Sequence, residues 1–263
     1  MRNYPDSSPA TVPAAGLARR PPVAAVFALV LVAAALLYGP ITQPAGYHAF
    51  ADQRTLFGIA HFADVVSNLG FLLVGLWGLS RRGTLEHTIF CAAIALTALG
   101  STWYHLAPDD QRLIWDRMPI ALACAALLAA SLRDGYRMRA ALLPLMCCGI
   151  ASVLWWSYSG DLRPYLLLQL APLVLIPALQ WESRASIASR KAFALAILLY
   201  VLAKVCELAD AAVFDALDLV SGHTVKHLLA TAAAWVLVKQ GRIDVDADTF
   251  RKRTNRVSSV SLH

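Results

Sequence analysis

The sequence predicts an all-α fold, a polytopic bundle of transmembrane helices, and two observations predict it. Hydrophobic residues make up 58% of the 263 residues and charged residues only 15%, whereas about a quarter of a typical soluble domain is charged. The charges cluster between long uncharged runs, and a helix needs about 20 apolar residues to cross a bilayer. Because a backbone in lipid must satisfy its own hydrogen bonds, these runs predict helices rather than single strands.

Eight segments qualify as membrane spans. The first, at 22–40, is expected to be a retained helix, because its apolar stretch is longer than a usual signal-peptide core and a long arm precedes it. The segment at 115–132 spans only if Asp116 and Arg117 lie at its mouth. The other six segments are 61–80, 87–107, 140–157, 163–180, 192–208 and 220–238.

Lysine and arginine are distributed unevenly between the loops. Most fall in the N-terminal arm, the second, fourth and sixth loops and the C-terminal tail, whereas the other side holds Arg54, Arg112, Arg117 and Arg163. The positive-inside rule then predicts an even number of spans with both termini in the cytoplasm. The net charge of +6 is explained by this topology, and without a recognition motif no nucleic-acid partner is expected.

Composition divides the chain into four parts. The arm at 1–21 is rich in Pro, Ala and Ser and is expected to be disordered in the cytoplasm. An additional N-terminal transmembrane helix at 22–40 and a seven-helix core at 41–240 follow. The basic tail at 241–263 is also expected to be cytoplasmic and unstructured.

Polar residues inside the predicted spans gather in the outer leaflet. Ionisable residues are costly there, so each one is a candidate functional residue. His223 and His227 are four residues apart on one helix face, the spacing at which a helix offers two imidazoles to one metal ion. Ser101 and His105 have the same spacing, and Asp116 follows after a short turn. Three histidines plus an open position for water form a typical catalytic zinc site.

Simpler interpretations exist for each feature alone. A single HxxxH pair in a membrane helix is often an interhelical hydrogen bond, and Asp116 could simply pair with a neighbouring arginine. His48 and His61 lie on the predicted outer side without partner spacing and would be accessory groups. His87 lies at the opposite, cytoplasmic face, where it is expected to be an interface residue.

The segments FADVVSNLGF (62–71), GSTWYHLAPDDQRLIWDRMPI (100–120) and SGHTVKHLL (221–229) resemble the alkaline ceramidase family. That family belongs to the CREST membrane-hydrolase superfamily, which includes the progestin and adiponectin receptors. The resemblance extends from about 47 to 238 and rests on an ordered set of features. These are SxxxH, an aspartate eleven residues beyond that histidine, and a late HxxxH.

The resemblance implies a seven-helix hydrolase core to which the helix at 22–40 is an addition. It also implies specific roles for residues of the site. Zinc ligands would be His105, His223 and His227; catalytic residues beside the activated water would be Asp116 and Ser101, with Ser67 nearby on the preceding helix.

The sequence departs from the family pattern at the start of the core. Members of the family have an acidic N-terminal segment that binds calcium, with a glutamate where His61 stands here. This chain offers only Asp52 in that segment. Asp64 also stands where the family pattern suggests an amide or a neutral residue.

The leading hypothesis is a zinc-dependent intramembrane hydrolase that cleaves the amide bond of ceramide or a similar N-acyl lipid. A related lipid hydrolase with another substrate would use the same residues. A non-catalytic CREST-type receptor or structural protein with a zinc site is the alternative from another class. A transporter that uses Lys204 and Glu207 is a further one, although this pair is more simply an ion pair. The sequence leaves acyl length, head group and oligomeric state open.

Overall fold

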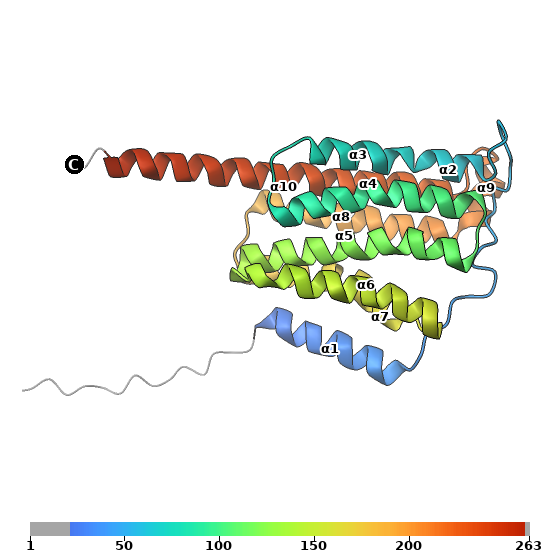
Figure 1. The fold of residues 1–263 in the computed structure, drawn as a ribbon, viewed down its shortest axis with the longest axis horizontal. Coiled ribbons are helices and arrows are strands. Elements are labelled where there is room, and N and C mark those ends of the chain that lie inside the picture. The colour runs from blue at the N-terminus through green and yellow to red at the C-terminus, as the bar shows by residue number, and fades with distance from the viewer. Residues whose placement is uncertain (1–21, 261–263) are drawn as a thin grey trace, which may run out of the picture.

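The computed structural model describes residues 22–260, and the side chains of 22–241. It is an all-α bundle, as the sequence predicts (Figure 1). The arm at 1–21, which we predicted to be disordered, lies outside the described residues.

Each of the eight predicted spans corresponds to one helix or to a pair of helices. The helices in chain order are α1 (Val23–Tyr38), α2 (Phe62–Ser67), α3 (Leu69–Leu79), α4 (Leu85–Leu106), α5 (Asp110–Tyr136), α6 (Leu142–Ser159), α7 (Arg163–Glu182), α8 (Ile187–Leu208), α9 (Asp210–Leu217) and α10 (Gly222–Val260), with the 3₁₀ turn η1 (Arg139–Ala141) before α6.

Several of these helices are long and apolar enough to cross a membrane, which indicates an integral membrane protein. Within the described residues five meet both criteria: α2 with α3, α4, α5, α6 (counted from η1) and α7. The pair α8 and α9, bent by 81°, makes a sixth if it counts as one span, while α1 is apolar but shorter. Helix α1 begins at the end of the bundle from which α10 leaves it (Figure 1).

The outside of the bundle is apolar, as lipid contact requires. Large apolar side chains such as Leu29, Leu143 and Val205 are more than half exposed. Inside, one buried cluster joins α3, α4, α5 and α10 around Cys91 and Ala126. Two others join α5 to α6 and α7, and α1 to α5, α7 and α8.

A helix cap at Asp109 and a close contact between the backbones of α4 and α5 fix the turn between these two helices. The Asp109 side chain accepts a hydrogen bond from the Arg112 backbone N–H at 2.7 Å, which caps the start of α5. Gly100 of α4 lies against the backbone of Trp115 in α5, where an added Cβ would be 2.7 Å from the Trp115 carbonyl carbon. The absence of a side chain at Gly100 therefore allows the two helices to approach closely.

The structure differs from the sequence prediction at the end of the chain. Helix α10 continues to Val260, whereas we predicted an unstructured tail over 241–263. The prediction rested on the loss of apolar residues, but a helix that leaves the bundle needs no apolar face to continue.

Candidate metal centre

The three predicted zinc ligands meet at one end of the bundle. His105 lies in the last turn of α4, and His223 and His227 lie in the first two turns of α10. One ring nitrogen from each lies within 4.8 Å of the others, and all three side chains are buried. The structure thus brings together the residues that the spacing predicts, and the group could hold a metal ion.

The ring nitrogens have a separation suited to a shared metal ion. The Nε2 atoms of His105 and His223 are 3.2 Å apart. Two nitrogens bound to one tetrahedral zinc at about 2.0–2.1 Å would be roughly 3.3–3.4 Å apart. The two rings therefore need little adjustment to bind one ion.

Ser67 of α2 fixes the orientation of His227. Its hydroxyl donates to the Asp64 carbonyl oxygen at 2.8 Å and lies 2.7 Å from His227 Nδ1. Because the hydroxyl proton is used on Asp64, Nδ1 must donate, and the lone pair of this imidazole is then on Nε2. A hydrogen bond to the nitrogen that does not bind the metal fixes the tautomer of a metal-binding histidine, so Ser67 acts through His227.

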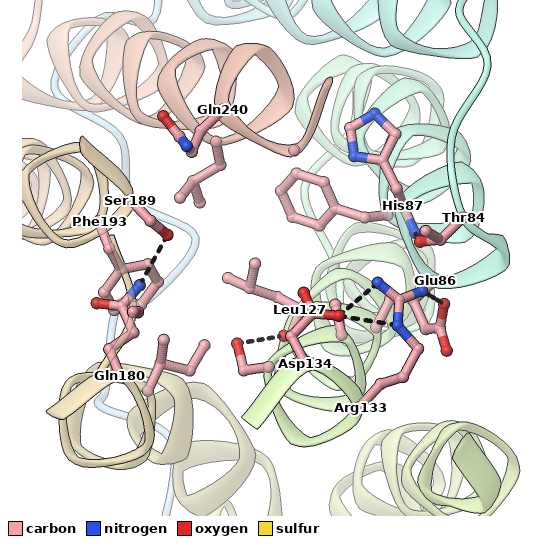
Figure 2. Close-up of a pocket in the computed structure, with 18 of the residues that line it drawn as sticks. Thr84, Glu86, His87, Leu127, Arg133, Asp134, Gln180, Ser189, Phe193 and Gln240 are labelled. Atoms are coloured by element: carbon pink, nitrogen blue, oxygen red, sulfur yellow. Dashed lines mark hydrogen bonds and ion pairs between the residues drawn. The ribbon is translucent and has the colours of Figure 1, made fainter. Parts of the chain in front are cut away.

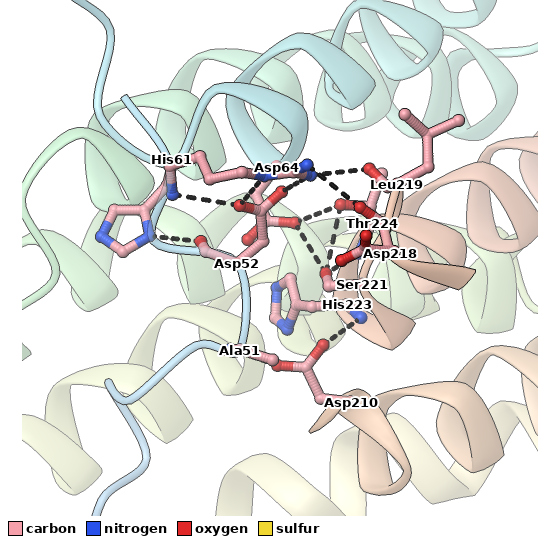
Figure 3. A network of polar contacts seen from close by, with 11 residues as sticks. Ala51, Asp52, His61, Asp64, Asp210, Asp218, Leu219, Ser221, His223 and Thr224 are labelled. Atoms are coloured by element: carbon pink, nitrogen blue, oxygen red, sulfur yellow. Dashed lines mark hydrogen bonds and ion pairs between the residues drawn. The ribbon is translucent and has the colours of Figure 1, made fainter. Parts of the chain in front are cut away.

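Asp64 connects α2 to the start of α10, a role that the sequence did not suggest. Its carboxylate is fully buried and accepts a hydrogen bond from the Thr224 hydroxyl at 2.6 Å. The Ser221 hydroxyl lies 3.4 Å from the same oxygen (Figure 3). Asp64 therefore holds in place the helical turn that carries His223.

The loop at 39–61 covers the histidines. The Phe50 ring lies against two of them, with centroids 4.7 Å from His105 and 4.5 Å from His223. Asp210 at the start of α9 accepts from the Ala51 backbone at 2.9 Å and from the His223 backbone at 2.7 Å (Figure 3). One carboxylate thus connects this loop, the bend after α8 and the start of α10.

Asp52 closes the same loop through Arg54. The Arg54 guanidinium donates to both carboxylate oxygens, at 2.8 and 2.7 Å, and to the carbonyl of Leu219 at 2.7 Å. The hydrogen bond from Arg54 holds the pKa of Asp52 below its usual value. Both oxygens of the Asp52 carboxylate are therefore paired with Arg54 rather than left open for a calcium ion.

The two other predicted catalytic residues lie beside the histidines on facing helices. Ser101 of α4 and Asp116 of α5 line one cavity of about 210 Å³ together with His227. The rest of its wall is largely apolar and includes Phe71, Ile94 and other residues of α5, α7, α8 and α10. In the described contacts the neighbouring arginines pair elsewhere, Arg112 with Asp109 and Arg117 with Gln43.

The other histidines of the described residues lie outside the cluster. His48 contacts the Tyr104 hydroxyl at 2.8 Å, and His61 contacts the Asp52 carbonyl at 3.0 Å. His87 lines a second, larger cavity of about 990 Å³ at the other end of the bundle (Figure 2). Arg133 also lines it, paired with Glu86 and Asp134.

Two contributors to the site, Phe50 and Asp210, were missed from the sequence, and Lys226 was placed among the polar residues of the outer leaflet without a role. Phe50 carried no signal, because an aromatic residue in a loop is not specific. Asp210 and Lys226 are charged residues in or beside apolar segments and could have been assigned to the site by the cost of burying charge. The Lys226 ammonium lies 3.0 Å from His223 Nε2.

The donor set fits a zinc ion held by three neutral imidazoles. His105 Nδ1 is buried without a hydrogen-bond partner among the described residues, and the Nε2 atom of the same ring faces His223 Nε2 at 3.2 Å. The candidate group contains three ligands, and catalytic zinc sites also have three protein ligands, whereas structural sites usually have four.

No protein-family model, curated protein or solved structure matches this chain.

Proposed function

We propose that this protein is a zinc-dependent intramembrane hydrolase that cleaves the amide bond of ceramide or a similar N-acyl lipid. The observation that carries the proposal is the buried group of three histidines beside a cavity that also exposes Ser101 and Asp116. The resemblance of three segments to the alkaline ceramidase family supports the choice of substrate.

Each residue has a role that its position allows. A bound zinc ion would lower the pKa of a water molecule to about 7 and polarise the substrate carbonyl. Asp116 would accept the proton of the attacking water and pass it to the departing amine. Ser101 would donate a hydrogen bond to the developing oxyanion or orient the water. The apolar wall of the cavity would receive the acyl chain.

The alternative is a CREST-type receptor or structural protein in which zinc only stabilises the bundle. The cavity disfavours this alternative, because a stabilising site needs neither an apolar chamber nor the Asp116 carboxylate beside the metal ligands. Transport is also disfavoured, because Lys204 pairs with Glu207 at 2.7 Å, as the sequence predicted.

The proposed orientation places both termini in the cytoplasm and the active site near the extracytoplasmic face. The histidines lie at the end of the bundle opposite to the start of α1 (Figure 1). The loops on the termini side carry most of the positive charge.

The test measures metal and activity on the same preparation. Zinc per chain and fatty-acid release from ceramide are determined for the purified protein and for His105→Ala, His223→Ala and Asp116→Asn. We expect about one zinc per chain, loss of zinc and activity in both histidine variants, and loss of activity alone in Asp116→Asn. His87→Ala, at the other end of the bundle, is the control and should match the parent. Zinc without release from any N-acyl lipid would support the receptor alternative.

A further inference from the structure

Lys226 lies between a candidate metal-binding histidine and a partly buried glutamate. Its ammonium is 2.9 Å from a carboxylate oxygen of Glu207 and 3.0 Å from His223 Nε2. The other oxygen of Glu207 pairs with Lys204 at 2.7 Å. Glu207 therefore holds Lys226 against the metal-binding face of α10.

This ammonium is part of the cavity described above. Lys226 and Lys204 line it together with Ser101, Asp116 and His227. A charged side chain at membrane depth is costly and usually marks an ion or substrate site. Glu207 is shared between two lysines, so one carboxylate balances two ammonium groups.

Metal binding would change the partners of Lys226. The lone pair of His223 Nε2 would be directed to the ion, and the lysine would lose that acceptor. An ammonium has three donors and no acceptor, so donors of Lys226 would be left for a ligand in the cavity. The positive charges of Lys204, Lys226 and a divalent ion would also exceed the negative charges of Glu207 and Asp116. The region of the cavity around these groups would then carry excess positive charge.

We propose that Lys226, oriented by Glu207, binds the carboxylate of an aliphatic lipid whose chain occupies the apolar part of the cavity. This inference rests on the proposed function and deepens it by naming the charge of the ligand. The carboxylate can come from two sources, the released fatty acid or the head group of an N-acyl amino acid substrate.

The test compares ligands that differ only in the carboxylate. Octanoate and octanol are soluble and share a chain, as do N-octanoylglycine and N-octanoylethanolamine. Calorimetric titration of the zinc-loaded and the zinc-free protein gives the affinity of each. We expect octanoate to bind the zinc-loaded protein at least about tenfold more tightly than octanol, as a charge-assisted hydrogen bond allows.

Lys226→Met should remove this preference and leave octanol binding unchanged, which also shows that the cavity is folded. Lys204→Met is the matched control, because it removes the same charge and the same Glu207 partner without a contact to His223. Its preference should change by less than about threefold. Equal binding of octanoate and octanol by the parent, or a preference retained in Lys226→Met, would overturn the proposal.

The second ligand pair identifies the source of the carboxylate. A preference for N-octanoylglycine that Lys226→Met abolishes assigns the carboxylate to the substrate, and a preference confined to octanoate assigns it to the product. The result is separable from the proposed function. A Lys226-dependent preference without any hydrolysis would leave the inference standing, whereas ceramide cleavage without the preference would leave only the hydrolase.

Discussion

Substitution of Gly100 by alanine tests whether the α4–α5 approach determines the geometry of the site. An added Cβ would lie 2.7 Å from the Trp115 carbonyl carbon and 3.2 Å from the Asp116 backbone nitrogen. Carbon atoms in ordinary contact are about 3.5–4.0 Å apart. Helix α5 must therefore move by about 1 Å, and Asp116 moves with it.

The expected cost has two parts. Overpacking of this kind destabilises a protein by about 1–3 kcal/mol, whereas glycine-to-alanine in a helix would by itself stabilise by about 0.5–1 kcal/mol. A displacement of about 1 Å at a catalytic group can also lower activity about 100-fold. Gly100→Ala should thus lower both the melting temperature and the activity while zinc still binds.

The assay is thermal unfolding in detergent with zinc content and hydrolysis measured on the same sample. Gly135→Ala, in the facing helix α5, is the control, because its added Cβ would lie 3.6 Å from the nearest atom, Ser183 Cβ. That variant should be as stable as the parent or slightly more stable. If Gly100→Ala matched Gly135→Ala in stability, the reasoning about the helix approach would be refuted.

Three further predictions concern the metal ligands and the covering loop. Ser67→Ala should lower zinc affinity about 10- to 100-fold with the fold intact, because His227 loses the hydroxyl that orients it. Competition with a chelator measures the zinc affinity, and an unchanged affinity would contradict this prediction. Chelation should lower the melting temperature of the parent, with recovery on adding zinc, and should not affect His105→Ala. The lowered pKa of Asp52 means that its stabilising contribution is present above about pH 4 and is lost as the pH falls through the folded-state pKa. Proteolysis of the loop at 39–61 should therefore increase towards pH 3 in the parent, whereas Asp52→Asn should be susceptible at every pH.

The sequence was most informative where a periodic pattern and a chemical cost coincide. The positions of the spans follow from apolar length, and the meeting of His105 with His223 and His227 follows from their depth at the same end of two spans. The structure confirms helices at the predicted positions, five or six of them within the described residues long and apolar enough to span a membrane, and it confirms that the three histidines meet. The catalytic roles of Ser101 and Asp116 stay predictions, although the two residues do line one cavity.

The sequence was least informative about contacts between distant segments. Nothing in the local pattern says that Phe50 covers two histidines, or that Asp210 connects the covering loop to α10. The sequence predicted the end of a span at 208, where α8 does end, but it did not predict helix α9 or the bend of 81° between the two helices. Such features depend on tertiary packing, which local propensity does not encode.

The two cavities at opposite ends of the bundle have a consequence for the membrane itself. Phe90, Leu127, Phe193 and Leu237 line both of them, so these apolar side chains lie between two cavities that contain polar groups. A hydrophobic constriction stays impermeable by excluding water. Serine in place of Leu127 is therefore expected to let water into the layer that separates the two cavities.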